Sequence, residues 1–118
     1  MTSHVFTFEG AEAVLAEIRP DLDEVVRLRG ELTVAVHAHQ EGDESVPLAD
    51  LKGMEARLAE LLDAVRARGV EVKGWAPLLL DFPAVRDGMD VLLCWLEGEA
   101  NIAWYHDPSH GFAGRLPL

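Results

Sequence analysis

Two of the five histidines of this chain lie near its C-terminal end, in the stretch AWYHDPSHGFAGRLPL at residues 103–118. This stretch holds His106 and His110, and Cys94 precedes it. Imidazole and thiolate groups bind zinc and similar metals. The spacing gives little support for a metal, because residues 107–110 fit the four positions of a β-turn and not one turn of a helix. We therefore expect no metal, with His106, His110 and Cys94 as weak candidates for metal ligands.

The side of the sheet on which Cys94 lies depends on the turn around Gly98. A two-residue turn pairs Glu97 with Ala100 and points His106 to the face opposite Cys94. A three-residue turn shifts the register by one residue and places Cys94 and His106 on the same face. The sequence leaves both registers open. In either register we expect Cys94 to be a small buried apolar residue.

Arg115 is the other residue of the tail whose type points to chemistry. Gly111 and Gly114 come shortly before it in the sequence and allow the backbone to approach another group closely. One interpretation is a site for an anion. The interpretation that we favour is a two-pronged ion pair with an internal carboxylate, Asp81 or Glu99, which would hold the tail across the sheet.

Aromatic side chains in the same part of the chain are suited to the floor of a pocket, although large aromatics in a small domain are usually core residues. The candidate ligand-binding residues are His106, Arg115, Asp81, Glu99 and Trp104. For His106 the alternative is a purely structural histidine whose ring nitrogens are hydrogen-bonded.

The sequence contains no complete catalytic constellation. None of the serines lies in a GxSxG elbow, and no pair of carboxylates is singled out for glycoside chemistry. The glycines of GFAGR are not followed by the Lys and Ser or Thr of a phosphate-binding loop. Whether the protein is an enzyme is therefore left open, its catalytic residues are unknown, and we expect no cofactor.

Composition narrows the classes of partner. The chain has 118 residues and a formal net charge of -11, and its few Lys and Arg residues form no basic stripe. Nucleic acid and membrane surfaces are therefore not expected as partners. The sequence shows neither an apolar run of roughly 20 residues nor a secretory signal, which predicts a cytoplasmic protein. Cys94 is the only cysteine, so no intrachain disulfide can form.

The first part of the chain, about residues 7–69, is predicted to be a long antiparallel helical hairpin. Thr7 fits the N-cap of the first helix, and apolar residues recur every three or four positions in both segments. Pro20 falls inside the first helix and is expected to kink or divide it. The polar run HQEGDESVP predicts the connection, and Gly69 is placed to end the second helix.

From about residue 70 to 118 the apolar pattern changes to a period of two. The segments VEVK, LLLDF, DVLLCWLEG and NIAWYHD indicate three to four strands. Asp87 and Gly88 form a favoured hairpin pair. A helical hairpin packed on an antiparallel β-meander is the simplest assembly, so we expect one α+β domain over residues 1–118.

Several ordered motifs resemble a bacterial and archaeal family known as domain of unknown function 2203. They are the opening FTFEGAEAVL, the helical hairpin, and then DFPA, LCW, GE and GFAGR in that order. In the family pattern a Trp usually precedes the histidine and an acidic residue often comes shortly before GF. Here these places hold Tyr105 and Ser109. The resemblance implies the fold and carries no established activity.

Two hypotheses for the function follow. The first is a non-catalytic binding or assembly module, expected to be a homodimer in which the hairpin or a sheet edge meets its mate. The alternative is a site for a small molecule, an anion or a metal, perhaps enzymatic, built around His106 and Arg115.

Overall fold

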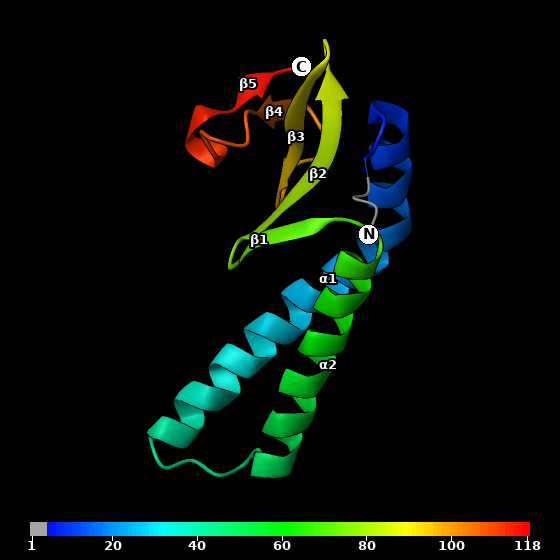
Figure 1. Cartoon of the computed structure of the whole chain (residues 1–118). Coiled ribbons are helices and arrows are strands. Elements are labelled where there is room, and N and C mark those ends of the chain that lie inside the picture. The colour runs from blue at the N-terminus through cyan, green and yellow to red at the C-terminus, as the bar shows by residue number, and fades with distance from the viewer. Residues whose placement is uncertain (1–4) are drawn as a thin grey trace. The chain divides into compact units, whose positions relative to one another are not determined.

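The computed structural model describes residues 5–118 as two helices followed by a five-stranded sheet (Figure 1). The helices are α1 (Phe8–Gln40) and α2 (Leu48–Ala67). The strands are β1 (Glu71–Trp75), β2 (Leu78–Arg86), β3 (Met89–Leu96), β4 (Trp104–His106) and β5 (Leu116–Pro117), with a short 3-10 helix, η1 (Phe112–Gly114), before the last strand. The predicted α+β class is confirmed.

The chain divides into two compact units. One contains the residues up to Ile18 together with Val65–Leu118, and the other contains Arg19–Ala64. Both helices run across the boundary between the units. The prediction of one domain over residues 1–118 stays a prediction.

Local signals set the ends of the helices as predicted. The Thr7 hydroxyl accepts a hydrogen bond from the Gly10 N–H at 2.9 Å, which satisfies one of the unpaired donors of the first turn of α1. After α2, Gly69 takes a left-handed conformation with a φ of 87°, and its N–H donates to the Arg66 carbonyl. Helix α1 is not divided at Pro20, and the predicted kink there stays a prediction.

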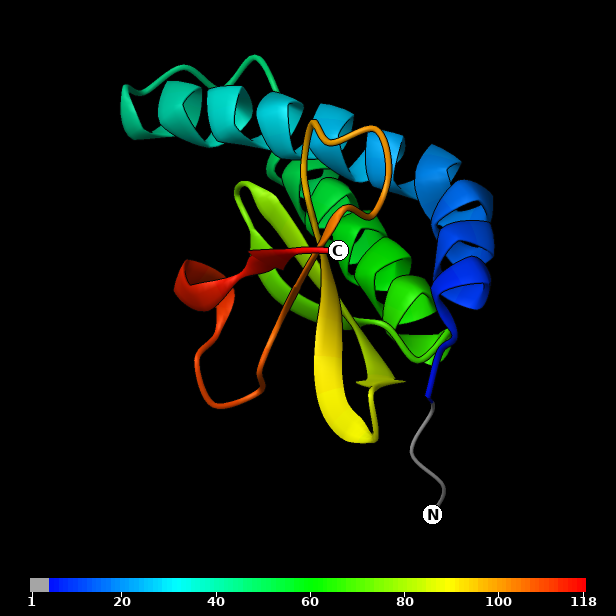
Figure 2. The same cartoon turned by 90° about the horizontal axis from the view of Figure 1, so that it is seen from above.

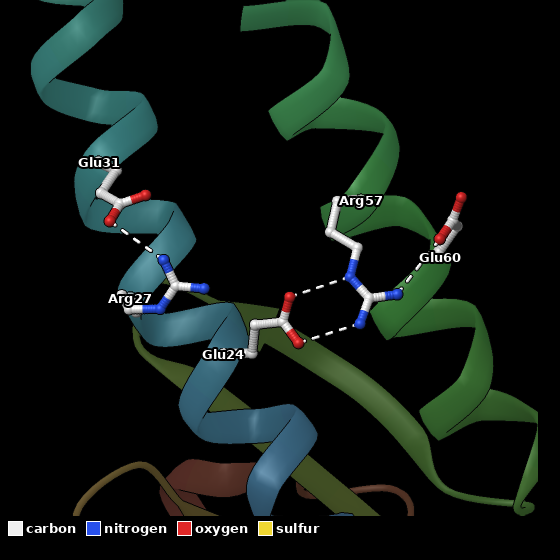
Figure 3. A network of polar contacts seen from close by, with 5 residues as sticks. All are labelled: Glu24, Arg27, Glu31, Arg57 and Glu60. Atoms are coloured by element: carbon white, nitrogen blue, oxygen red, sulfur yellow. Dashed lines mark hydrogen bonds and ion pairs between the residues drawn. The ribbon is translucent and has the colours of Figure 1, made fainter. Parts of the chain in front are cut away.

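Within Arg19–Ala64 the two helices bury leucine-rich stripes and carry ion pairs on their exposed surface. The buried residues include Leu22, Val25, Leu28, Leu32, Leu51, Leu58 and Leu61. Arg57 of α2 donates two hydrogen bonds to the Glu24 carboxylate of α1, at 2.9 and 3.0 Å, and a third to Glu60 (Figure 3). The bond from Arg57 lowers the pKa of Glu24. Because these side chains are exposed, the network contributes little to stability.

The sheet is an antiparallel meander in the order β1-β2-β3-β4-β5. The predicted hairpin turn between β2 and β3 is confirmed, because Asp87 and Gly88 both have positive φ values, 53° and 78°, as a type I′ turn requires. The sequence predicts three to four strands. The fifth, β5, has only two residues, too few to show an alternating pattern, and it pairs with β4.

The strand register places Cys94 and His106 on one face of the sheet. Cys94 lies opposite Trp104, and Leu92 lies opposite His106. This is the shifted register and not the one in which Glu97 pairs with Ala100. We call this side the tail face, and it carries Leu79, Asp81, Leu92, Cys94, Trp104 and His106. The tail, residues 107–115, forms a loop beside the β2–β3 hairpin (Figure 2).

The other face of the sheet is apolar and carries Leu80, Phe82, Ala84, Val91, Leu93 and Trp95. Phe6 packs edge-on against Phe82, with ring centroids 5.3 Å apart. The Glu12 carboxylate of α1 accepts a hydrogen bond from the Ile102 N–H at 2.8 Å. This bond ties the start of α1 to the loop between β3 and β4.

Candidate functional site

The centre of the tail face is a buried pair of polar side chains, Asp81 and His106. Asp81 comes from β2 and His106 from β4, and the two meet across β3 with the His106 Nε2 atom 3.1 Å from the Asp81 Oδ1 atom. Each residue is only 2% exposed. Buried polar groups are costly unless they are hydrogen-bonded, so each of these side chains depends on the other as its partner.

The hydrogen bonds fix how many protons the buried pair holds. The His106 Nδ1 atom lies 3.0 Å from the Asp107 carbonyl oxygen, which only accepts, so Nδ1 must carry a hydrogen. One further proton lies between Nε2 and the Asp81 oxygen. The pair is an imidazolium with a carboxylate or a neutral imidazole with a carboxylic acid, and both forms have zero net charge. Neither ring nitrogen is free to act as a base.

Electrostatics around the pair favour the protonated form of Asp81. Burial raises the pKa of Asp81, and its hydrogen bond to His106 offsets only part of that effect. Lys73 of β1 also lowers the pKa of Asp81 through its charge. Lys73 itself pairs with Glu71 at 2.9 Å, and this bond raises the pKa of Lys73.

The tail leaves β4 through a tight turn. The His110 N–H donates to the Asp107 carbonyl at 3.0 Å, as expected for a turn over residues 107–110. The Asp107 carboxylate accepts both the hydroxyl of Ser109, at 2.6 Å, and its backbone N–H, at 2.8 Å. These two bonds lower the pKa of Asp107. One carboxylate oxygen of Asp107 and the hydroxyl of Ser109 are thus engaged in shaping the turn.

Replacement of Ser109 by alanine is expected to raise the pKa of Asp107 part of the way to its usual value. The hydroxyl bond is lost, while the bond from the backbone N–H stays. Side-chain carboxyl shifts followed by NMR against pH will measure this change. Asp43 is the internal control, because its pKa is lowered by bonds from Ser45 that the substitution leaves intact. An unchanged Asp107 pKa would show that the hydroxyl bond is absent in solution.

A second cluster, which we call the tail clasp, fastens the end of the tail and consists of Arg115, Glu99, Trp104 and Phe112. Two Arg115 nitrogens donate to the two Glu99 oxygens at 3.3 and 3.1 Å. The guanidinium lies 4.6 Å from the centre of the Trp104 ring and 4.5 Å from that of Phe112. The predicted ion pair of Arg115 is therefore made with Glu99, and Asp81 pairs with His106 instead.

Cys94 lies beneath the clasp. It is a fully buried free thiol, as expected, and Arg115 is 4.0 Å from its sulfur. Burial raises the pKa of the thiol and outweighs the opposite effect of the arginine. A thiol that stays protonated is a poor nucleophile and a poor metal ligand.

A small cavity opens beside the buried pair, and we call it the tail-face cavity. It has a volume of about 180 Å³ and is lined by Lys73, Leu79, Asp81, Leu92, His106, Pro108, Gly111 and Phe112. A larger open cavity of about 540 Å³ shares Lys73, Leu92 and Pro108 with it. The tail-face cavity thus combines apolar walls with one buried polar pair, which is the usual make-up of a small-molecule site.

The structure brings some of the candidate residues together and separates others. Asp81 and His106 line the tail-face cavity, whereas His110 lines a different cavity with Arg86 and Tyr105. Within residues 5–118 no group of three or more His, Cys, Asp or Glu side chains is arranged to hold a metal ion. Sequence reasoning did not assign a role to Lys73 or Phe112. Lys73 reaches the tail-face cavity beside a register irregularity in β1, for which the sequence offers no clear signal.

The fold and the site define a class of small α+β proteins, with a helical hairpin and an antiparallel meander whose tail covers a buried His–Asp pair. The chain belongs to the family described as uncharacterized conserved protein (DUF2203), which matches residues 4–118. No curated protein and no solved structure matches the chain significantly. Neither helix in the described part of the chain is both long and apolar enough to span a membrane.

Proposed function

We propose that the protein is a non-catalytic binding module that holds a small molecule in the tail-face cavity. The observation that carries the proposal is the position of the buried Asp81–His106 pair in the wall of this cavity. Buried ionisable groups in a mostly apolar pocket are a common mark of a binding site. A pair with a purely structural role would not need to line a cavity, because it would be equally stable when covered completely by apolar side chains.

The side chains near the cavity that could take part in catalysis already have hydrogen-bond partners or are buried, which argues against an enzymatic role. Both ring nitrogens of His106 are engaged, by Asp81 and by the Asp107 carbonyl. The Ser109 hydroxyl donates to the Asp107 carboxylate, and Cys94 is buried under Arg115. A general base needs a free lone pair, and a nucleophile needs access to the substrate. His106 has no free lone pair, Ser109 already donates its hydroxyl proton, and the Cys94 thiol has no access to a substrate.

The tail clasp supports a positioning role for Arg115 in place of a direct one. Its guanidinium is occupied by Glu99 on one side and by two aromatic faces on the others. An anion would have to displace the Glu99 carboxylate to reach it. We therefore propose that Arg115, Glu99 and Trp104 hold the tail that forms one wall of the cavity and do not touch the ligand.

The homodimer expected from the sequence stays a prediction. Both sheet edges carry features that oppose pairing with another strand. Strand β1 has a register irregularity and Lys73, and β5 is two residues long and contains Pro117. The sheet edges are therefore poor dimer surfaces, so of the two surfaces that the sequence suggests we propose the helical hairpin for a homodimer.

Occupancy of the cavity is tested by titrating the ¹⁵N-labelled full chain with small aromatic probes. At least one of phenol, anisole, benzoate and benzylammonium is expected to shift the amide signals of Leu79, Leu92 and Gly111 together, because these residues line one cavity. The Leu79→Trp variant fills the space and is expected to abolish the shifts. Val85→Trp is the matched control, since Val85 lies on the same strand and face and does not line the cavity.

Failure of all four probes to shift these signals would overturn the proposed function. So would equal binding by the parent and the Leu79→Trp variant, because the probes would then bind elsewhere.

A further inference from the structure

We infer that the ligand of the tail-face cavity is a small neutral molecule with an apolar ring and one hydrogen-bond donor, such as a phenol. This inference rests on the proposed function and names the chemistry that the cavity selects. Three properties of the cavity carry it: its balanced charge, its one unused acceptor and its apolar walls.

The charged groups at the cavity already neutralise one another. Lys73 pairs with Glu71 at 2.9 Å, and Asp81 shares one proton with His106. An entering carboxylate or ammonium would lose part of its hydration and find no unpaired opposite charge, because Lys73 already pairs with Glu71 and Asp81 with His106. An ion that is desolvated without a partner of its own is strongly disfavoured. A neutral ligand avoids this cost.

The buried pair leaves one acceptor for a ligand. Asp81 uses its Oδ1 atom for His106, and no hydrogen bond from residues 5–118 engages its Oδ2 atom. Both nitrogens of His106 are already engaged. A ligand hydroxyl or N–H that donates to Oδ2 would satisfy the remaining capacity of a buried carboxyl group. A ligand that fills this acceptor avoids the cost of leaving a buried polar atom without a partner.

The remaining walls are apolar and suit a flat ring. Leu79 and Leu92 come from the sheet, and Pro108 and Phe112 come from the tail. The volume of about 180 Å³ is close to that of engineered apolar cavities of about 150 Å³ that bind benzene. Phe112 offers an aromatic contact for the ring. A molecule with a single ring therefore fits, and one with a long chain would have to extend into the larger open cavity.

Phenol, anisole, benzoate and benzylammonium each contain one six-membered ring and differ in hydrogen-bond donor and in charge. NMR titrations of the protein with each probe at pH 7 therefore test the two requirements separately. Phenol is expected to bind about tenfold more tightly than anisole, which keeps the ring and lacks the donor. It is also expected to bind more tightly than benzoate and benzylammonium, which add a negative or a positive charge. Dissociation constants come from the amide signals of Leu79, Leu92 and Gly111 in the full chain.

Equal affinities for phenol and anisole would overturn the donor part of the inference. Tighter binding of benzoate or benzylammonium would overturn the neutral-ligand part. Either result leaves the proposed function standing, since the cavity would still be occupied. The Leu79→Trp variant must lose the binding of phenol, and Val85→Trp must keep it, for the affinities to refer to this cavity.

Discussion

Replacement of Asp81 by alanine is expected to lower the free energy of unfolding by about 3 kcal/mol, because it leaves the buried His106 ring without its partner. His106→Ala is expected to cost a similar amount, since it leaves the Asp81 carboxyl buried and unpaired. Urea unfolding followed by far-UV circular dichroism measures both losses.

The double replacement Asp81→Val with His106→Leu separates pairing from packing. Apolar side chains of similar size remove both polar groups at once, so the double variant is expected to lie within about 1 kcal/mol of the parent. The sum of the two single losses would be several times larger. The single replacements Asp81→Val and His106→Leu complete the cycle, and a double loss equal to the sum of these two would show that the side chains do not interact in solution.

A further variant, Asp81→Asn, allows the pKa of Asp81 to be tested through the pH dependence of stability. Burial raises the folded-state pKa of Asp81 above its unfolded value of about 4. The stability that comes from this shift is complete below the unfolded pKa and is lost as the pH rises through the folded pKa. The stability of the parent relative to Asp81→Asn is therefore expected to fall as the pH is raised above about 4. A relative stability that rises with pH over this range would mean that the folded pKa is lowered.

Local chemistry explains why much of the fold could be predicted. The Thr7 cap, the Gly69 terminus and the Asp87–Gly88 turn each depend on a few neighbouring residues, and the structure has all three. Strand β5 depends instead on pairing with β4, and two residues carry no period of their own. The register after Gly98 likewise depends on a loop of seven residues between β3 and β4, whose length the turn signal alone does not give.

The residues of the candidate site could also be proposed from the sequence, whereas their contacts could not. Residue type singled out Asp81, Glu99, Trp104, His106 and Arg115 as candidates, because carboxylates, aromatic rings, imidazole and guanidinium are the groups in this part of the chain that can bind a ligand. Their partners could not be assigned, because the sequence allows Arg115 to form its two-bond ion pair with either Asp81 or Glu99. The choice is made by the strand register, which brings Asp81 to His106 across β3 and leaves Glu99 beside Arg115.

Replacement of Arg115 by alanine is expected to lower the free energy of unfolding by about 2 kcal/mol. The substitution removes two hydrogen bonds to Glu99 and the stacking of the guanidinium between Trp104 and Phe112. The loss is smaller than for the Asp81–His106 pair, because the Arg115 and Glu99 side chains are 19% and 21% exposed and water partly solvates the carboxylate that is left. Thermal and urea unfolding measure it.

Arg115→Lys is the matched control for this clasp. Lysine restores the positive charge, but a point charge does not reproduce two parallel bonds or the flat stacking of a guanidinium, so only part of the lost stability is expected to return. Glu99→Gln keeps the size of the carboxylate side chain and is expected to weaken the same pair. In the Arg115→Ala chain, Glu99→Gln should then cost less than it does in the parent, because the partner is already gone. If Arg115→Ala and Arg115→Lys both unfold at the same temperature as the parent, Arg115 does not hold the tail, and a direct role in binding the ligand becomes the better explanation of its contact with Phe112, which lines the tail-face cavity.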